Sequence, residues 1–197
     1  MKHLGFAAIV SSLLIVIGAP AYAAFVDAKH SVYFAGHTLI ELNGIVTADP
    51  TYDAGDYFGD LSDAGTVPNA IDITGLGPAI SISADGIWTH GSAAPTGPEG
   101  KGVLELTRAQ YGIFGISLLT AGLNMLVGVF LDGSSPAPGA APASLSTDDP
   151  GDDMTMPLLS QSFAIGASLS DIMVPVGATR CSLACTTDSS GPTIVVV

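Results

Sequence analysis

A polar turn near the C-terminus contains the residue types best suited to binding a ligand. Residues 187–192 read Thr-Asp-Ser-Ser-Gly-Pro, so the carboxylate of Asp188 lies among several hydroxyl groups. These residue types also favour a tight turn. Calcium takes oxygen ligands, and the same oxygens form hydrogen bonds with sugars. The sequence therefore predicts a turn that holds a hard cation or a sugar.

Two expected strands position this turn. Residues 180–186 alternate between two faces, one of which is formed by Cys181, Leu183 and Cys185. This is the period of a strand that is buried on one side. Residues 194–197 are a β-branched run, which is typical of a second strand. We therefore predict a C-terminal hairpin with Asp188 at its tip.

Two histidines and an acidic segment are further candidates for metal binding. His30 and His37 lie in one segment, but no third ligand is marked, so ordinary strand or loop histidines are favoured over a shared metal. Residues 49–63 are rich in aspartate and lack the EF-hand pattern. A solvated acidic loop is favoured there, with calcium binding or sugar stacking on its aromatic residues as the alternative.

Cys181 and Cys185 are the only cysteines in the sequence. An exported pair usually indicates a disulfide. However, four residues of strand span roughly 13 Å, whereas a disulfide requires Cα atoms within about 7 Å. We expect two small buried side chains, and a disulfide only if the strand ends before Cys185.

The composition excludes some partners and favours one fold class. The 197 residues carry a net charge of −13, which argues against nucleic acid and against anionic lipid surfaces. The chain contains 24 glycines and 13 prolines, and most of its acidic residues are aspartate. These residues form turns rather than helices, so we predict an all-β protein with many loops.

The N-terminus resembles a secretory signal peptide. Residues 1–23 have a basic start, a short apolar region and an Ala-Tyr-Ala cleavage site. An uncleaved anchor helix is disfavoured because the apolar region is short and ends at Pro20. We expect cleavage near Ala23-Ala24 and a secreted or periplasmic mature chain.

Several strands are predicted between these two ends. Residues 79–84 alternate cleanly, and strands are also expected at residues 32–35 and 38–42. Residues 111–131 carry no charge, which by length alone allows a membrane span. Their glycines and the Thr-Ala-Gly-Leu-Asn stretch at residues 120–124 favour two buried strands joined by a turn, with no membrane span in the mature chain. Residues 132–153 are predicted to be a loop.

The order of several motifs resembles a known family. Ser-Ile-Ser-Ala-Asp-Gly-Ile-Trp-Thr-His-Gly at residues 81–91 is followed by Gly-Pro-Glu-Gly at residues 97–100 and by the apolar residues 126–131. Val-Pro-Val-Gly-Ala-Thr-Arg at residues 174–180 and a final Ser190-Gly191 turn complete the pattern. It is similar to the galactose-specific, calcium-dependent lectin domain of bacteria. It is also similar to secreted lectin-like proteins of Proteobacteria that often carry a PEP-CTERM sorting tail.

The resemblance implies an antiparallel jelly-roll β-sandwich over residues 70–197. Residues 24–69 would then supply one or more N-terminal strands and the acidic loop. The sequence ends at Val197 with no sorting tail, so anchoring to the cell envelope by that route is not expected.

The resemblance also implies which residues bind a ligand. His90, Asp188 and Ser189 are the nearest matches to the family's calcium ligands, and Trp88, His90 and Asp188 are the candidates for carbohydrate binding. The stretch that holds galactose in the family has no counterpart after Gly100. The implied calcium and sugar site is therefore degenerate.

The predicted function is a secreted carbohydrate-binding module, with a glycan or exopolysaccharide as partner and Ca²⁺ as cofactor. The alternative is a structural extracellular or matrix protein that keeps the sandwich without binding sugar. No HExxH, GxSxG or phosphate-binding loop motif marks a catalytic residue. We therefore do not expect an enzyme.

Overall fold

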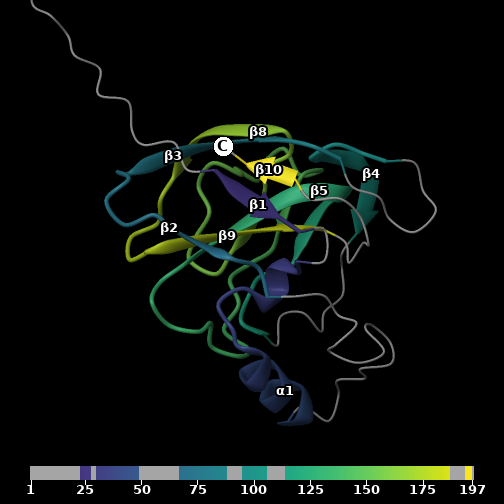
Figure 1. The fold of residues 1–197 in the computed structure, drawn as a ribbon. Helices are drawn as coiled ribbons and strands as arrows, with labels where there is room; N and C mark the ends of the chain where they lie inside the picture. Colours follow the sequence, from purple (N-terminus) through teal and green to yellow (C-terminus); the bar gives the residue numbers. More distant parts are fainter. Residues whose placement is uncertain are drawn as a thin grey trace, which may run out of the picture.

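The fold was analysed in a computed structural model, which describes residues 23–27, 30–48, 67–87, 95–105, 114–186 and 194–196 (Figure 1). Strands dominate these residues, so the all-β prediction is confirmed. In chain order the elements are β1 (Ala24–Val26), the 3-10 helix η1 (Val32–Phe34), α1 (Leu39–Ala48), β2 (Ala70–Asp72), β3 (Ala79–Asp85), β4 (Glu99–Glu105), β5 (Leu119–Leu131), β6 (Leu145–Ser146), β7 (Ser162–Ala164), β8 (Ser168–Met173), β9 (Arg180–Cys185) and β10 (Ile194–Val196).

The strands form two sheets. One has the order β1-β10-β3-β8, and the other has the order β2-β9-β5-β4, with β6 and β7 also paired to β5. Every pairing between these strands is antiparallel except that of β5 with β6. In Figure 1, β3 and β8 lie at the top, β9 and β2 lie below them, and α1 lies at the bottom.

A shared apolar cluster joins the two sheets. Val26 of β1, Ile82 of β3 and Ile172 of β8 belong to the same buried cluster as residues of β5, β7 and β9. Within it, the rings of Phe130 and Phe163 stack with their centroids 5.2 Å apart. The first sheet therefore covers one face of the second.

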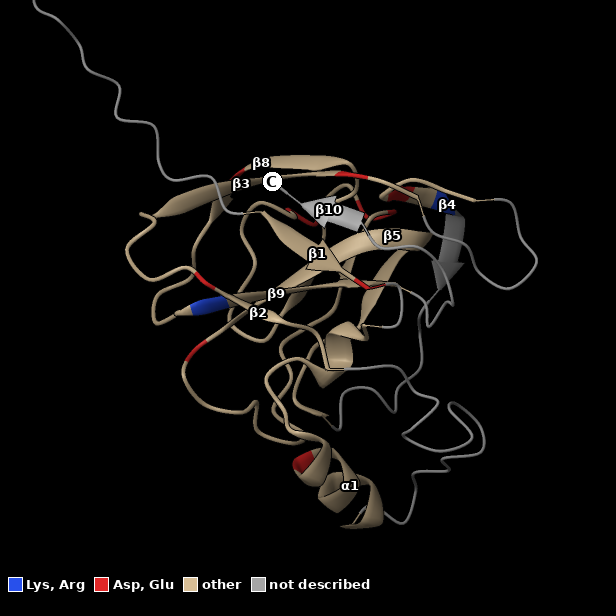
Figure 2. Cartoon of the chain, viewed as in Figure 1, with Lys and Arg blue, Asp and Glu red and all other residues tan. Residues whose placement is uncertain are grey.

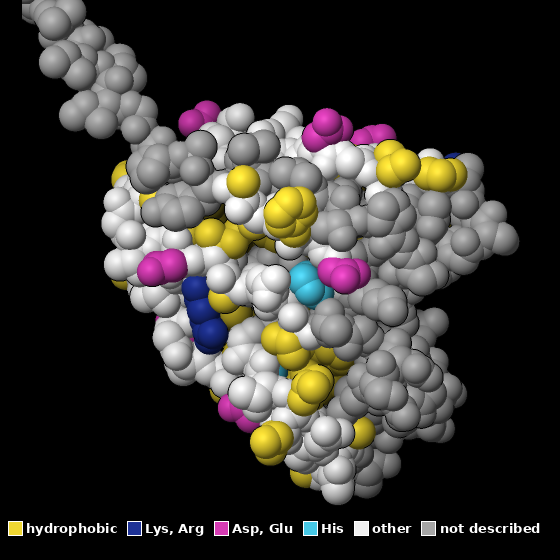
Figure 3. All heavy atoms as spheres, in the orientation of Figure 1, with side chains coloured by type: hydrophobic (Ala, Val, Ile, Leu, Met, Phe, Trp, Pro, Cys, Tyr) yellow, Lys and Arg dark blue, Asp and Glu magenta, His cyan; other side chains and the backbone are white. Residues whose placement is uncertain are grey.

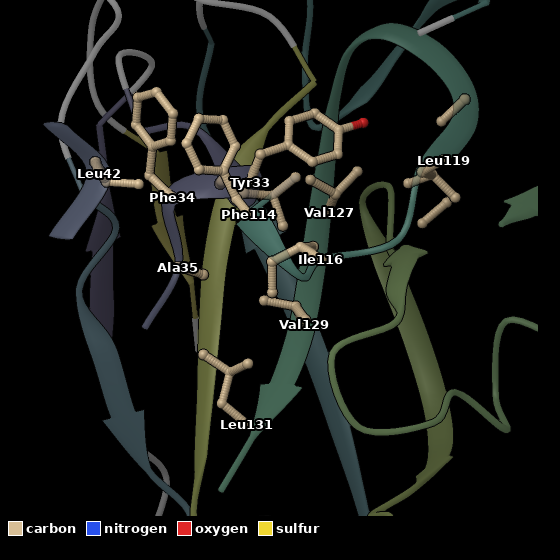
Figure 4. Packing of buried hydrophobic residues seen from close by; sticks show 14 residues of the cluster. Tyr33, Phe34, Ala35, Leu42, Phe114, Ile116, Leu119, Val127, Val129 and Leu131 are labelled. Atoms are coloured by element: carbon tan, nitrogen blue, oxygen red, sulfur yellow. The ribbon is translucent and has the colours of Figure 1, made fainter. Parts of the chain in front are cut away.

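A separate apolar cluster covers the opposite face of β5 (Figure 4). Val127, Val129 and Leu131 point to this side, whereas Leu126 and Phe130 belong to the cluster between the sheets. This is the alternation of side chains along a strand. Much of the cover on this second face comes from residues outside the strands. They are Tyr33 and Phe34 of η1, Leu42 of α1, and the segment with Phe114 and Ile116.

The predicted faces of residues 180–186 are confirmed, but the burial on one side is wrong. Cys181, Leu183 and Cys185 face the cluster between the sheets, as expected, and Ala184 belongs to the opposite cluster. Both faces of β9 are buried because the second cluster covers the far side of its sheet. The predicted β9–β10 hairpin is also wrong, since β9 pairs with β2 and β5 while β10 pairs with β1 and β3. The chain thus crosses from one sheet to the other after Thr186.

The two strands predicted at residues 32–35 and 38–42 are helical instead. Thr38 and Glu41 form a capping box: the backbone N–H of Thr38 donates to Glu41 Oε2 at 2.6 Å, and that of Glu41 donates to Thr38 Oγ1 at 3.2 Å. This Thr-x-x-Glu spacing starts a helix because it satisfies two backbone donors at once. This capping-box spacing is visible in the sequence, but the apolar residues around it led to the prediction of strands.

The predicted turn within residues 120–124 is also wrong, because β5 runs through it as one strand. Asn124 has a φ of 60° and allows a local distortion without ending the strand. In contrast, the strand predicted at residues 79–84 is confirmed by β3, and the turn at residues 97–100 by a hydrogen bond from Gly100 N to Gly97 O. Residues 132–153 are mostly loop, as predicted.

Acidic side chains are spread over loops and strand ends in the described chain (Figure 2). Several of them hold turns in place: Asp132, Asp149 and Asp153 each accept a hydrogen bond from the backbone N–H two residues later. Within the described residues, no helix is long and apolar enough to cross a membrane.

Gly128 provides a test of the packing between β5 and β7. A Cβ atom at Gly128 would lie 2.8 Å from the ring of Phe163, its cross-strand partner. We expect Gly128→Ala to lower the free energy of unfolding by about 1–3 kcal/mol, because the ring must shift. Gly133→Ala is the control, since a Cβ there meets nothing within 4 Å. Equal stability of the two variants in urea denaturation would contradict this packing.

Candidate functional site

The residues predicted to bind calcium or sugar lie outside the described part of the chain. Trp88 and His90 belong to residues 88–94, and Asp188 and Ser189 belong to residues 187–193. Residues 49–63 are also outside it. The structure does describe the residues on either side of the first two segments, and their positions show where each segment begins and ends.

The first point of contact between these flanks is the pairing of β3 with β10. Asp85 pairs with Val195, and Ala84 pairs with Val196. Residues 88–94 begin three residues after Asp85, and its partner Val195 lies two residues after the end of residues 187–193. One end of each segment therefore lies beside this pair, in the two central strands of the four-stranded sheet.

The second point of contact is the distortion of β5 at Asn124. Asn124 is buried, and its Nδ2 donates a hydrogen bond to Thr96 Oγ1 at 3.1 Å. On the following residue, Met125 N donates to Thr186 Oγ1 at 3.0 Å, and Thr186 Oγ1 donates to Gly122 O at 2.8 Å. The other end of each segment is thus bound to adjacent residues of one strand.

These contacts bring together the ends of two segments that are almost a hundred residues apart in the sequence. Thr96 follows residues 88–94, and Thr186 precedes residues 187–193. Sequence reasoning missed the roles of Asn124, Thr96 and Thr186. An asparagine within an apolar strand was the available signal, because asparagine tolerates positive φ and is costly to bury without partners.

The structure gives His37 a structural contact. It is buried, and its Nε2 lies 2.7 Å from the carbonyl oxygen of Phe114. Since a carbonyl oxygen only accepts, Nε2 carries the proton. His30 is also buried, and loss of hydration lowers its pKa although Asp27 opposes this shift. His30 therefore stays neutral at neutral pH.

No cluster of three or more His, Cys, Asp or Glu side chains suited to a metal ion occurs among the described residues. Cys181 and Cys185 are both buried and do not form a disulfide, in agreement with the strand geometry. Burial raises the pKa of the Cys181 thiol to about 12. The two cysteines therefore act as small core side chains.

Comparison of the chain with protein families, curated proteins and solved structures gave no match.

Thr186 allows a test of the attachment to β5. We expect Thr186→Val to lower the free energy of unfolding by about 1–3 kcal/mol, because it leaves Met125 N and Gly122 O without this partner in the interior. Thr147→Val is a matched control, since the Thr147 hydroxyl lies on the surface and donates to Thr120 O at 3.3 Å. Urea denaturation of both variants measures the difference. A loss for Thr186→Val no greater than that for Thr147→Val would show that the hydroxyl does not hold this junction.

The burial of the cysteines leads to a second prediction. At pH 8 the folded protein should react with a thiol reagent much more slowly than the denatured protein, because a buried thiol with a raised pKa forms little thiolate. Denaturation without reductant should release two reactive thiols per chain. Fewer thiols under those conditions would reveal a disulfide.

Proposed function

We propose that this chain is a secreted, non-enzymatic carbohydrate-binding module with a jelly-roll β-sandwich of the lectin-like type. The proposal joins two independent lines of support. One is the motif order that resembles calcium-dependent lectin domains. The other is the all-β architecture with two sheets around a shared core.

The observation that carries the proposal is the convergence of the two segment ends. The resemblance assigns ligand binding to residues 88–90 and 188–189, which belong to different parts of the sequence. In the structure, the described flanks of both segments meet at the β3–β10 pair and at Asn124 of β5. A shared site for Trp88, His90, Asp188 and Ser189 requires this proximity.

In the proposed site, His90, Asp188 and Ser189 contribute oxygen ligands to Ca²⁺, with His90 using its backbone carbonyl. Trp88 presents an aromatic face to the sugar, and Asp188 accepts hydrogen bonds from sugar hydroxyls. A bound Ca²⁺ would bridge hydroxyl groups that water otherwise solvates. Since calcium takes six to eight oxygens, water and sugar would complete the coordination.

Thermal unfolding with millimolar calcium and with EDTA tests the metal. We expect a higher melting temperature in calcium, because a ligand that binds only the folded state stabilises it. Asp188→Ala should abolish the shift. Asp148→Ala, which removes the same charge from an exposed position in another loop, should retain it.

A glycan array with the same two solutions tests the sugar. Calcium-dependent binding that Asp188→Ala and Trp88→Ala both remove is the expected result. Silence on the array together with no thermal shift would contradict the proposal and favour a structural extracellular protein. Binding that persists in EDTA would support carbohydrate binding and contradict a role for calcium in it.

A further inference from the structure

A groove of about 770 Å³ lies between α1 and the loop of residues 135–139, on the far side of β5 from the four-stranded sheet. Its apolar walls include Ile45 of α1 and Pro136 and Pro138 of the loop. In Figure 3, hydrophobic side chains appear at the surface over the α1 region in the lower part of the view. None of the described lining residues of the groove belongs to the site proposed above.

The loop that forms one wall is fixed against the core. A Cβ at Gly36, which has a φ of +81°, would lie 2.9 Å from Pro136, and one at Gly115 would collide with the backbone of Ala137. Arg180 holds the start of the loop, since its Nε donates to Asp132 O at 2.8 Å and its Nη2 donates to Ser134 O at 2.6 Å. The groove is therefore largely formed before any ligand arrives.

Glu41 is the acidic residue among the described lining residues of the groove. Its carboxylate accepts hydrogen bonds from Thr38 N and from Ser135 Oγ, which lies across the groove at 2.9 Å. These hydrogen bonds, the backbone one first, lower the pKa of Glu41. The carboxylate is ionised at neutral pH and held in one place, and a carboxylate has further lone pairs for other donors.

His37 lies beside this carboxylate in the lining of the groove. Its Nε2–H is used by Phe114 O, and its buried Nδ1 has no hydrogen-bond partner in the described structure. An imidazole with this proton on Nε2 presents a lone pair at Nδ1. No lysine or arginine occurs among the described lining residues.

We propose that this groove binds small amphiphilic cations, with an alkylammonium head group at Glu41 and a hydrocarbon body against Ile45, Pro136 and Pro138. An ammonium group has three donors and no acceptor, which matches a wall that offers acceptors. An anionic head group would meet the Glu41 carboxylate. A neutral alcohol would gain the apolar contact and lose the charge attraction.

Titration with n-hexylammonium, 1-hexanol and hexanoate at one ionic strength tests the proposal. Chemical shift changes in the protein NMR spectrum report both affinity and location. We expect hexylammonium to bind about tenfold more tightly than hexanol, the ratio produced by roughly 1.4 kcal/mol, and hexanoate to bind most weakly. Similar affinities for the three ligands would show that the Glu41 carboxylate does not attract the cation, and would overturn the proposal.

Two variants separate charge from shape. Glu41→Gln removes the charge but preserves a capping box, because glutamine also serves at this position. It should reduce the affinity for hexylammonium to that for hexanol. Gly44→Leu should abolish binding of both, because a side chain at Gly44 has open space around its Cβ and would fill the groove.

Gly44→Ala is the matched control for the second variant. It should stabilise α1, since alanine is a better helix former than glycine, and should weaken binding far less than Gly44→Leu does. Unchanged hexylammonium affinity in Gly44→Leu, with the fold confirmed by its NMR spectrum, would place the ligand elsewhere. Unchanged affinity in Glu41→Gln would exclude the carboxylate as the cation's partner.

Discussion

The burial of β5 on both faces is the constraint on which the rest of the structure depends. A strand of 13 residues with apolar side chains on each side needs an apolar cover on each side and a partner on each edge. The four-stranded sheet supplies one cover, and η1, α1 and the segment around Phe114 supply the other. Along its edges β5 pairs with β4, β6, β7 and β9. The layers on both sides of the larger sheet follow from this one strand.

The same strand organises the proposed carbohydrate site. A continuous ladder would leave no polar feature in the middle of β5, but the positive φ of Asn124 turns local backbone groups away from regular pairing. Thr186 satisfies two of these groups, and the side chain of Asn124 reaches Thr96. A local irregularity in the core strand thereby holds Thr96, which follows residues 88–94, close to Thr186, which precedes residues 187–193.

The packing of α1 against the larger sheet leaves room for the groove. Because α1 packs through Leu42 alone as a fully buried residue, much of the helix stands away from the sheet. The loop after β5 is held on the opposite side by Arg180 and by close contact with Gly36 and Gly115. The groove is the space left between a lightly packed helix and a tightly held loop.

Local patterns in the sequence determined several of the secondary-structure elements. The alternation in residues 79–84 and 180–186 is enough to define β3 and β9 with their faces, and the strand spacing kept Cys181 and Cys185 apart. The Thr38-x-x-Glu41 box also encodes the start of α1, although the apolar residues around it equally suggest a strand. Only the tertiary structure decided which sheet each strand joins. Pairing of β9 with β5 depends on burying two apolar faces at once, and no short stretch of sequence contains that information.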